Sequence, residues 1–228
     1  ALSLAADTAA ALWCDDAATR RLALELGVEA FGTPALLQAI AEATPMGEAQ
    51  GAIAAKLVHL YTVGVPFDPA VYELALDFDG WQPLGTAIAL RHSGASSLSS
   101  KLTLIHAALD RAAGDAKPDS LRDWSQVLGE FISDLDVGER RKGNQVRVTQ
   151  TLLAQHWQTP STLPFVAAGL RQAFGEDWTT ALSSAVRELR QELATSYGHA
   201  VASGYLLALI KGLPEEDRLF AVGSILER

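Results

Sequence analysis

The chain has 228 residues, 49% of them hydrophobic, and carries a formal net charge of −9 at pH 7. A chain of this length and composition can bury a full hydrophobic core, in one large domain or two small ones, and nothing in it indicates disorder. Binding to nucleic acid or to anionic membranes without sequence preference depends on an excess of Lys and Arg. The acidic balance therefore argues against both and leaves only a local basic patch.

The first 26 residues contain a helical signal, a strand and an acidic turn. The chain begins at Ala1, without an initiator methionine, in an apolar pattern typical of a helix, so we expect it to be part of a longer protein. Residues 11–14 form a short apolar run that predicts a strand, and Asp15 and Asp16 follow at its carboxyl end. Asp16 is a favourable N-cap for the amphipathic helix expected over 17–26.

A second strand and helix follow directly. Gly27 ends the preceding helix, and residues 28–31 are another short apolar run. The next helix is expected to begin with Thr33 as its N-cap and Pro34 at its first helical position. This strand, helix, strand, helix order predicts two parallel strands, because antiparallel neighbours are usually joined by short turns.

The rest of the chain shows only helical periodicity, with Ala and Leu recurring at three- and four-residue spacing. The segments expected to be helical are 49–63, 69–76, 82–90, 97–113, 120–135, 144–156, 163–174, 178–196, 200–210 and 215–226. No motif repeats at a fixed period near 34 or 40 residues, as regular helical solenoids require. The predicted fold is therefore mostly α, with a small parallel α/β part over 1–46 and an irregular helical domain over 47–228.

The single cysteine and the hydrophobic pattern predict where in the cell the protein is located. Cys14 is the only cysteine, which rules out an internal disulfide and favours a reducing cytoplasm. Its place in an apolar strand favours an ordinary core thiol over a reactive one. No uninterrupted apolar run reaches the roughly 18 residues that span a bilayer, and no signal peptide is evident. We expect a cytoplasmic protein without a membrane partner.

Residues 1–43 resemble the C-terminal portion of a PIN domain, the metal-dependent ribonuclease fold of bacterial toxin–antitoxin systems and their relatives. The resemblance is carried by Trp13-Cys14-Asp15-Asp16, Arg20-Arg21, Ala23, Leu26-Gly27-Val28, Phe31-Gly32-Thr33 and Leu36-Leu37. It implies a small parallel sheet between helices that gathers three or four acidic side chains around Mg²⁺ or Mn²⁺. The late members of that acidic set fall at Asp15 and Asp16.

The resemblance also implies that half of such a site lies elsewhere. The family's first strand, with its essential aspartate, and the helix that carries the next acid both precede the portion that this chain resembles. Hydrolysis of a phosphodiester by a divalent metal needs oxygen ligands from several elements, which two neighbouring carboxylates do not supply. We expect an upstream part of the same protein to complete the site, and this chain alone to be inactive. Asp15 is the favoured metal ligand and catalytic residue; for Asp16 an N-cap role is favoured over direct ligation.

Other candidate sites are weaker. Arg140, Arg141, Lys142 and Arg147 form the densest positive cluster and could contact phosphate or an acidic partner, although a solvated helix end explains them better. The histidines lack the spacing of helical zinc ligands, and no phosphate-binding loop or nucleophile-elbow motif occurs. For Trp81, Trp124, Trp157 and Trp178, core packing is favoured over base stacking.

Two hypotheses about function remain. In the first, the chain is the C-terminal part of a PIN-like ribonuclease, and its helical region positions substrate or binds a partner protein. In the second, it is a non-catalytic helical scaffold that retains a degenerate PIN fold. We expect RNA binding by the helical region to be weak because of its acidic charge. Acidic residues upstream of Ala1 would favour the first hypothesis, and neutral residues there the second.

Overall fold

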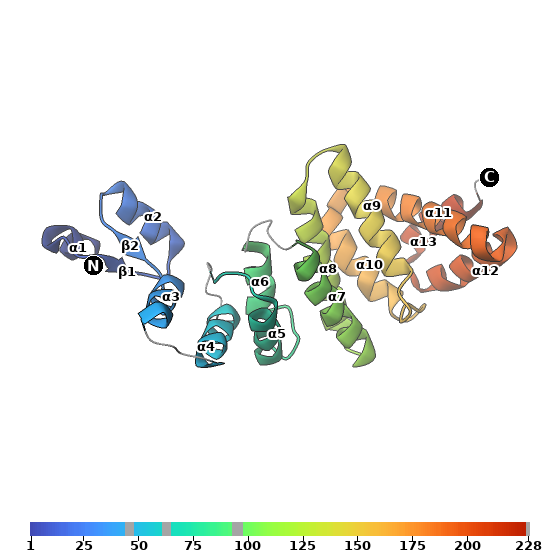
Figure 1. Cartoon of the computed structure of the whole chain (residues 1–228). Coiled ribbons are helices and arrows are strands. Elements are labelled where there is room, and N and C mark those ends of the chain that lie inside the picture. Colours follow the sequence, from blue (N-terminus) through green and yellow to red (C-terminus); the bar gives the residue numbers. More distant parts are fainter. Residues whose placement is uncertain (44–47, 61–64, 93–97, 227–228) are drawn as a thin grey trace. The chain divides into compact units, whose positions relative to one another are not determined.

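The computed structural model describes residues 1–43, 48–60, 65–92 and 98–226. The chain divides into two compact units, Ala1–Lys101 and Leu102–Arg228 (Figure 1). The domain boundary that we predicted at 44–47 lies outside the described residues, as do positions 61–63 and 97 of two predicted helices. No helix in the described ranges is long and apolar enough to cross a membrane.

The first unit begins with a small α/β segment. Its elements are α1 (Leu2–Thr8), β1 (Leu12–Trp13), α2 (Ala17–Glu25), β2 (Ala30–Phe31) and α3 (Thr33–Ala43). The two strands pair in parallel, with Leu12 opposite Ala30 and Trp13 opposite Phe31. The predicted order of elements and the parallel pairing are confirmed, although each strand has two residues where four were expected.

The core of this segment is very small. Ala5, Leu12, Ala23 and Val28 form its buried cluster, which brings α1, β1, α2 and the loop between α2 and β2 together. Burying a leucine or a valine is worth about 1.5–3 kcal/mol, whereas ordering the backbone costs about 1–2 kcal/mol for every residue. Trp13 points to the opposite face of the sheet and is 60% exposed. The segment therefore needs further contacts to be stable.

Three helices follow in the first unit: α4 (Glu48–His59), α5 (Pro69–Phe78) and α6 (Gly85–His92). The α5 N-terminus is capped as its sequence predicts, because Asp68 accepts hydrogen bonds from the second and third backbone N–H groups and Pro69 is the first helical residue. A Cβ on Gly85 would lie 2.2 Å from the carbonyl oxygen of His59, so α6 can begin this close to α4 only with glycine there.

The described residues of the second unit form helices joined by turns and short loops, without a strand. The unit contains the end of α7 (Leu98–Gly114), then α8 (Pro118–Leu135), α9 (Glu139–Leu153), α10 (Leu163–Phe174), α11 (Trp178–Tyr197), α12 (His199–Leu209) and α13 (Glu215–Leu226). The long helix α11 packs against α9, α12 and α13, and α8 packs along α10 (Figure 1). The prediction of helices alone after residue 50 is confirmed for the part of the chain that the structure describes.

Glycine determines how closely α8 and α10 approach. A Cβ on Gly169 of α10 would lie 2.1 Å from the carbonyl oxygen of Arg122, and one on Gly129 of α8 would lie 2.6 Å from the Cβ of Ala173. Each helix therefore places a glycine where the other is nearest. Trp124 and Leu128 of α8 are fully or almost fully buried.

One helix boundary differs substantially from the sequence prediction. The helix expected over 144–156 is α9, which begins five residues earlier at Glu139 and ends at Leu153. Its first turn consists of the charged residues 139–142, which carry no apolar periodicity because they face solvent or bond to nearby groups. Hydrophobic spacing alone therefore could not show that residues 139–142 belong to the helix.

Candidate functional site

Asp15 lies two residues after the end of β1 and binds the start of α3. Its Oδ1 accepts a hydrogen bond from the backbone N–H of Thr33 at 2.6 Å, and its Oδ2 accepts one from the Thr33 hydroxyl at 2.7 Å. Thr33 is the first residue of α3, so this N–H is one of the helix donors that have no partner within the helix. Asp15 thus caps α3 across 18 positions of sequence.

This arrangement corrects the predicted start of α3. We expected Thr33 to be the N-cap and Pro34 the first helical residue, but the carbonyl of Gly32 already accepts from the N–H of Leu36, which makes Thr33 the first helical residue. The Thr33 hydroxyl is directed to Asp15 and does not cap its own helix. The capping acceptor comes from β1, which the local sequence around α3 could not reveal.

Three neighbours hold the Asp15–Thr33 pair in place. The indole Nε1 of Trp13 donates to the Thr33 hydroxyl at 3.1 Å, and Arg20 donates to the carbonyl oxygen of Cys14 at 2.8 Å. A Cβ on Gly32 would lie 2.9 Å from Nη1 of Arg20 and 3.2 Å from Oδ1 of Asp15, so glycine leaves the space that these groups occupy. Trp13 and Arg20 were not predicted as site residues. The only sequence signal for them was that they belong to the same motif as Asp15 and Thr33.

Asp16 has the separate role that its sequence favours. Its carboxylate accepts a hydrogen bond from the backbone N–H of Thr19 at 2.5 Å and caps α2. The same hydrogen bond lowers the pKa of the Asp16 carboxyl below its usual value. The predicted N-cap is confirmed. The two adjacent carboxylates therefore bind the N-termini of different helices, Asp15 that of α3 and Asp16 that of α2.

The acidic turn can offer only part of a metal site. A carboxylate has about four lone-pair positions, so Asp15, which is exposed and accepts two hydrogen bonds, keeps acceptor capacity for a cation. Carboxylate oxygen is the type of ligand that Mg²⁺ prefers and that also suits Mn²⁺. Within the described ranges, however, no group of three or more His, Cys, Asp or Glu side chains is placed to hold a metal. The donor type fits, and the number of donors does not.

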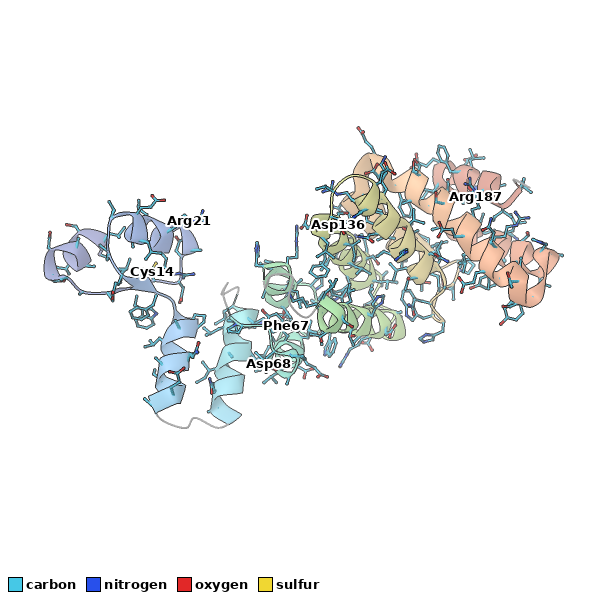
Figure 2. The ribbon with its side chains drawn as sticks, turned by 45° about the horizontal axis from the view of Figure 1, so that its top comes forward. Cys14, Arg21, Phe67, Asp68, Asp136 and Arg187 are labelled. Carbon is cyan, nitrogen blue, oxygen red and sulfur yellow. The ribbon has the colours of Figure 1, made fainter. Side chains whose placement is uncertain are left out.

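The basic cluster on α9 is divided between structural and exposed side chains. Arg141 donates from Nε to the carbonyl oxygens of Ser133 and Asp136, at 3.0 and 3.3 Å, and so stabilises the end of α8. Asp136, the residue that follows α8, is labelled in Figure 2. Lys142 pairs with Glu139 at 3.3 Å. Arg140 and Arg147 remain exposed, seven residues apart on one side of α9. Only these two keep the potential to bind an anionic partner.

The tryptophans that the sequence assigned to packing have structural contacts. Trp124 and Trp178 are buried, and the indole of Trp178 donates to Asp217 at 3.0 Å. Trp81 donates to Asp77 at 2.8 Å and Trp157 to Asp110 at 2.6 Å. Asp77 is four residues from Trp81, whereas Asp110 on α7 and Asp217 on α13 are 47 and 39 positions from the tryptophans that they bind. These bonds support the packing interpretation over base stacking.

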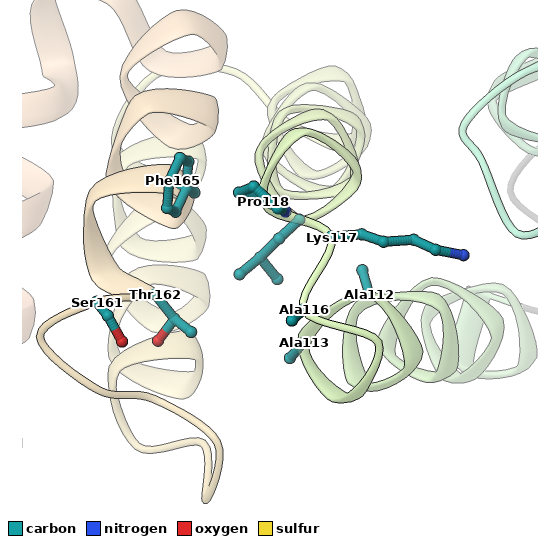
Figure 3. A pocket seen from close by; sticks show the side chains of 9 residues that line it. Ala112, Ala113, Ala116, Lys117, Pro118, Ser161, Thr162 and Phe165 are labelled. Carbon is teal, nitrogen blue, oxygen red and sulfur yellow. The ribbon is translucent and has the colours of Figure 1, made fainter.

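One cavity of about 240 Å³ lies between the end of α7, the start of α8 and the start of α10 (Figure 3). Its polar lining groups are already engaged: the Thr162 hydroxyl donates to the carbonyl oxygen of Trp157, and Lys117 pairs with Asp115. Figure 3 shows the Lys117 side chain extending away from Ser161 and Thr162. Alanine side chains make up much of the remaining wall, so we assign this cavity no chemistry.

A second cavity, of about 310 Å³, lies between α11, α12 and the end of α9. Its lining is apolar and aromatic and consists of Ala154, Leu189, Leu193, Tyr197, Val201, Ala202 and Tyr205. Several of these side chains are exposed despite their apolar character. The cavity is an open groove on the helical unit and contains none of the residues that the sequence analysis singled out.

Comparisons with known proteins returned no matching family model, no matching curated protein and no matching solved structure.

Proposed function

We propose that residues 1–43 are the C-terminal portion of a PIN-like metal-dependent ribonuclease and that the helices which follow position substrate or bind a partner. The observation that carries this proposal is Asp15, held at the carboxyl end of a parallel strand beside the N-terminus of α3. Ligands of parallel α/β sheets bind at the carboxyl ends of the strands. A helix N-terminus also favours negative charge, such as that of a phosphate.

The chemistry assigns different tasks to the residues of the turn. Mg²⁺ or Mn²⁺ would generate a hydroxide nucleophile and neutralise charge on the phosphodiester. Asp15 would be one of its ligands, with Thr33 fixing the orientation of the carboxylate through two hydrogen bonds. Asp16 would chiefly cap α2 and would contribute negative charge nearby. The remaining acids would come from an upstream part of the same protein.

Exposed apolar side chains in residues 1–43 support the proposal that this segment belongs to a larger sheet. Trp13 on β1 and Leu22, Leu24 and Leu26 on and after α2 are 48–63% exposed. Parallel sheets are almost always covered on both faces, and a two-stranded sheet is marginal on its own. Further strands and helices packed on this segment would bury these side chains. A cytoplasmic location belongs to the same proposal and rests on the single cysteine.

The test compares two substitutions in the protein extended upstream of Ala1. Asp15→Asn removes charge but little volume, so we expect it to abolish Mn²⁺-dependent cleavage of a single-stranded RNA. Asp16→Asn should retain much of the activity, because asparagine caps a helix about as well as aspartate. Circular dichroism would verify that both variants fold. Equal cleavage by the two variants, or activity that survives EDTA, would contradict the proposal.

A non-catalytic scaffold is the second candidate, and one specific observation favours it. The described residues contain no group of acids complete enough for metal catalysis, whereas the helical unit carries an open apolar groove. In this case the extended protein would lack acids at the upstream positions and would cleave no RNA with either metal. The helical unit would then act by binding another protein.

A further inference from the structure

The groove on the second unit has the dimensions of a helix-binding site. Leu189, Leu193 and Tyr197 line it at four-residue intervals along α11, and Val201 and Tyr205 line it from α12. Leu189 and Tyr197 are eight residue steps apart on α11, which corresponds to about 12 Å at 1.5 Å per step. This length is a little more than two turns of a docked helix. Amphipathic helices bind such grooves through apolar side chains at positions i, i+3 or i+4, and i+7.

The second observation is that α12 contains no charged residue apart from the titratable His199 at its first position. Its outer side carries Val201, which is 61% exposed, and Tyr205, which is 46% exposed. Nothing lies within 4 Å of the position that a Cβ on Gly204 would occupy. An apolar side of a helix is normally buried. The helix α12 packs mainly against α11, with smaller contacts to α13 and to the turn at Ile210–Gly212, whereas Val201 and Tyr205 stay exposed.

The charged groups beside the groove are acidic. Glu188 and Glu192 are exposed and directly precede Leu189 and Leu193 on α11. Glu192 accepts a hydrogen bond from Gln150 of α9 at 3.1 Å, one turn before Ala154, which lines the groove. This places the two glutamates along the edge that α9 and α11 form.

Arg190 directly follows Leu189 on α11, but its guanidinium is bound to α12. Arg190 donates to Ser203, which is about 200° round α12 from Val201 and therefore on its other side. Arg187, labelled in Figure 2, is likewise about 200° round α11 from Leu189. Arg147 lies two turns before Ala154 on α9, about 10 Å along the helix axis. The edge of the groove that carries Glu188 and Glu192 is therefore negative.

The size of the lining argues against a second copy of the chain as the occupant. Seven residues line the groove, whereas a stable protein–protein interface involves about 20–30 residues on each side. Two copies would also bring the same acidic edges together. A single helix needs only a few apolar anchors, and basic residues beside them would complement Glu188 and Glu192.

We propose that the groove formed by α11, α12 and the end of α9 binds a basic amphipathic α-helix of a partner protein. Leucine-sized side chains of that helix would fill the space between Leu193 and Val201, and Lys or Arg on its flank would face Glu188 and Glu192. This inference rests on the partner-binding role proposed for the helical unit and requires neither the metal nor Asp15.

The test uses the chain of residues 1–228 and three fluorescein-labelled synthetic peptides of 16 residues. The first places Leu at helical i, i+4 and i+7 positions with Lys on the flanks, the second replaces Lys by Glu, and the third is a scrambled isomer of the first. Fluorescence anisotropy should show binding of the Leu/Lys peptide at least about tenfold tighter than of the other two, a difference of about 1.4 kcal/mol.

Substitutions then locate the binding site. Val201→Lys should weaken binding of the Leu/Lys peptide about tenfold or more, because it introduces a like charge at an apolar contact. Leu219→Lys on α13 is the matched control, since Leu219 is 67% exposed and does not line the groove; it should change binding less than about twofold. Glu188→Gln together with Glu192→Gln should reduce both the preference for Lys over Glu peptides and its salt dependence.

Several outcomes would overturn the inference. They are equal binding of the scrambled peptide, unchanged binding by a Val201→Lys variant with a native circular dichroism spectrum, and equal loss in the Leu219→Lys control. If Leu219→Lys weakened peptide binding and Val201→Lys did not, the peptide would bind near α13. That result would refute this groove but keep a partner-binding role for the helical unit. Asp15→Asn should bind the peptide like the parent chain, so failure of the ribonuclease proposal would be seen separately.

Discussion

The α/β segment of residues 1–43 and the helical unit of residues 102–228 are stabilised in different ways. The segment buries four small or medium apolar side chains, and the hydrogen bonds that Asp15 and Asp16 accept organise its helix ends. The helical unit buries long rows of Leu, Val, Ile and aromatic side chains and relies on close helix contacts at glycine. A polar substitution should therefore matter most in the first region and a change of volume in the second.

The contrast has a functional side. Asp15, Thr33 and Trp13 share a connected series of hydrogen bonds while remaining accessible, so the segment can present polar groups to a ligand. The helical unit instead presents an apolar surface next to acidic residues. Catalysis requires fixed polar groups, and recognition of a helix requires apolar anchors. The two regions are each suited to one of the two proposed roles.

The strongest test of the packing side of this comparison is Gly169→Ala. The added Cβ would meet the backbone of Arg122 at 2.1 Å, so α8 and α10 would have to separate. We expect the free energy of unfolding of the helical unit to fall by about 3 kcal/mol, the upper part of the usual range for overpacking. Urea unfolding followed by tryptophan fluorescence, with hydrogen exchange over residues 118–174, would measure this change.

Gly143→Ala on α9 is the matched control. Nothing lies within 4 Å of the position of its added Cβ, and a helix-interior alanine is favoured over glycine by about 0.5–1 kcal/mol. This variant should be slightly more stable than the parent. Similar destabilisation by both substitutions would show that close helix contact at Gly169 does not hold the unit together.

Thr33→Val tests whether hydrogen bonds organise the α/β segment. Valine keeps the backbone N–H that binds Oδ1 of Asp15 but removes the hydroxyl that joins Asp15 to Trp13. In the upstream-extended protein we expect metal-dependent cleavage to fall by about 10–100-fold, as when a group that orients a metal ligand is lost. In residues 1–228, amide exchange around the start of α3 should become faster.

The control for this variant is Thr8→Val on α1. Its hydroxyl donates to the carbonyl oxygen of Leu4 within the same helix at 2.7 Å and contacts neither Asp15 nor Trp13. Cleavage and exchange near α3 should be unchanged. If Thr33→Val behaved like Thr8→Val, the Asp15–Thr33 bond would be incidental to the site.

The smallest expected effect concerns Asp16 and pH. The pKa of its carboxyl is lowered in the folded chain from a reference value of 3.8, chiefly by the Thr19 backbone N–H. The stability that this cap contributes is therefore fully present above pH 3.8 and is lost as the pH falls through the lower folded-state pKa. Asp16→Asn should flatten this part of the stability profile, because asparagine caps without titrating. Thermal unfolding between pH 7 and pH 2.5 would show it, and an unchanged slope in Asp16→Asn would contradict the assignment.

Local features of the chain were predictable because their partners lie a few residues away. Asp16 caps α2 through Thr19, three positions along, and Asp68 caps α5 through residues two and three positions along. Helices α10 and α13 have the bounds that their apolar spacing predicts, since one face of each meets the core. The parallel βαβ order also followed from short apolar runs separated by a helix.

Contacts between distant segments required the tertiary structure. The pairing of Asp15 with Thr33 spans 18 positions and depends on how β1 and β2 align, which explains why the cap of α3 was misassigned. The charged first turn of α9 and the division of its basic cluster depend on the carbonyl groups that the end of α8 presents to Arg141. The groove between α11 and α12 arises only because the packing of these two helices leaves some of their apolar side chains uncovered. Sequence periodicity identifies an apolar face, whereas the path of the chain decides what covers it.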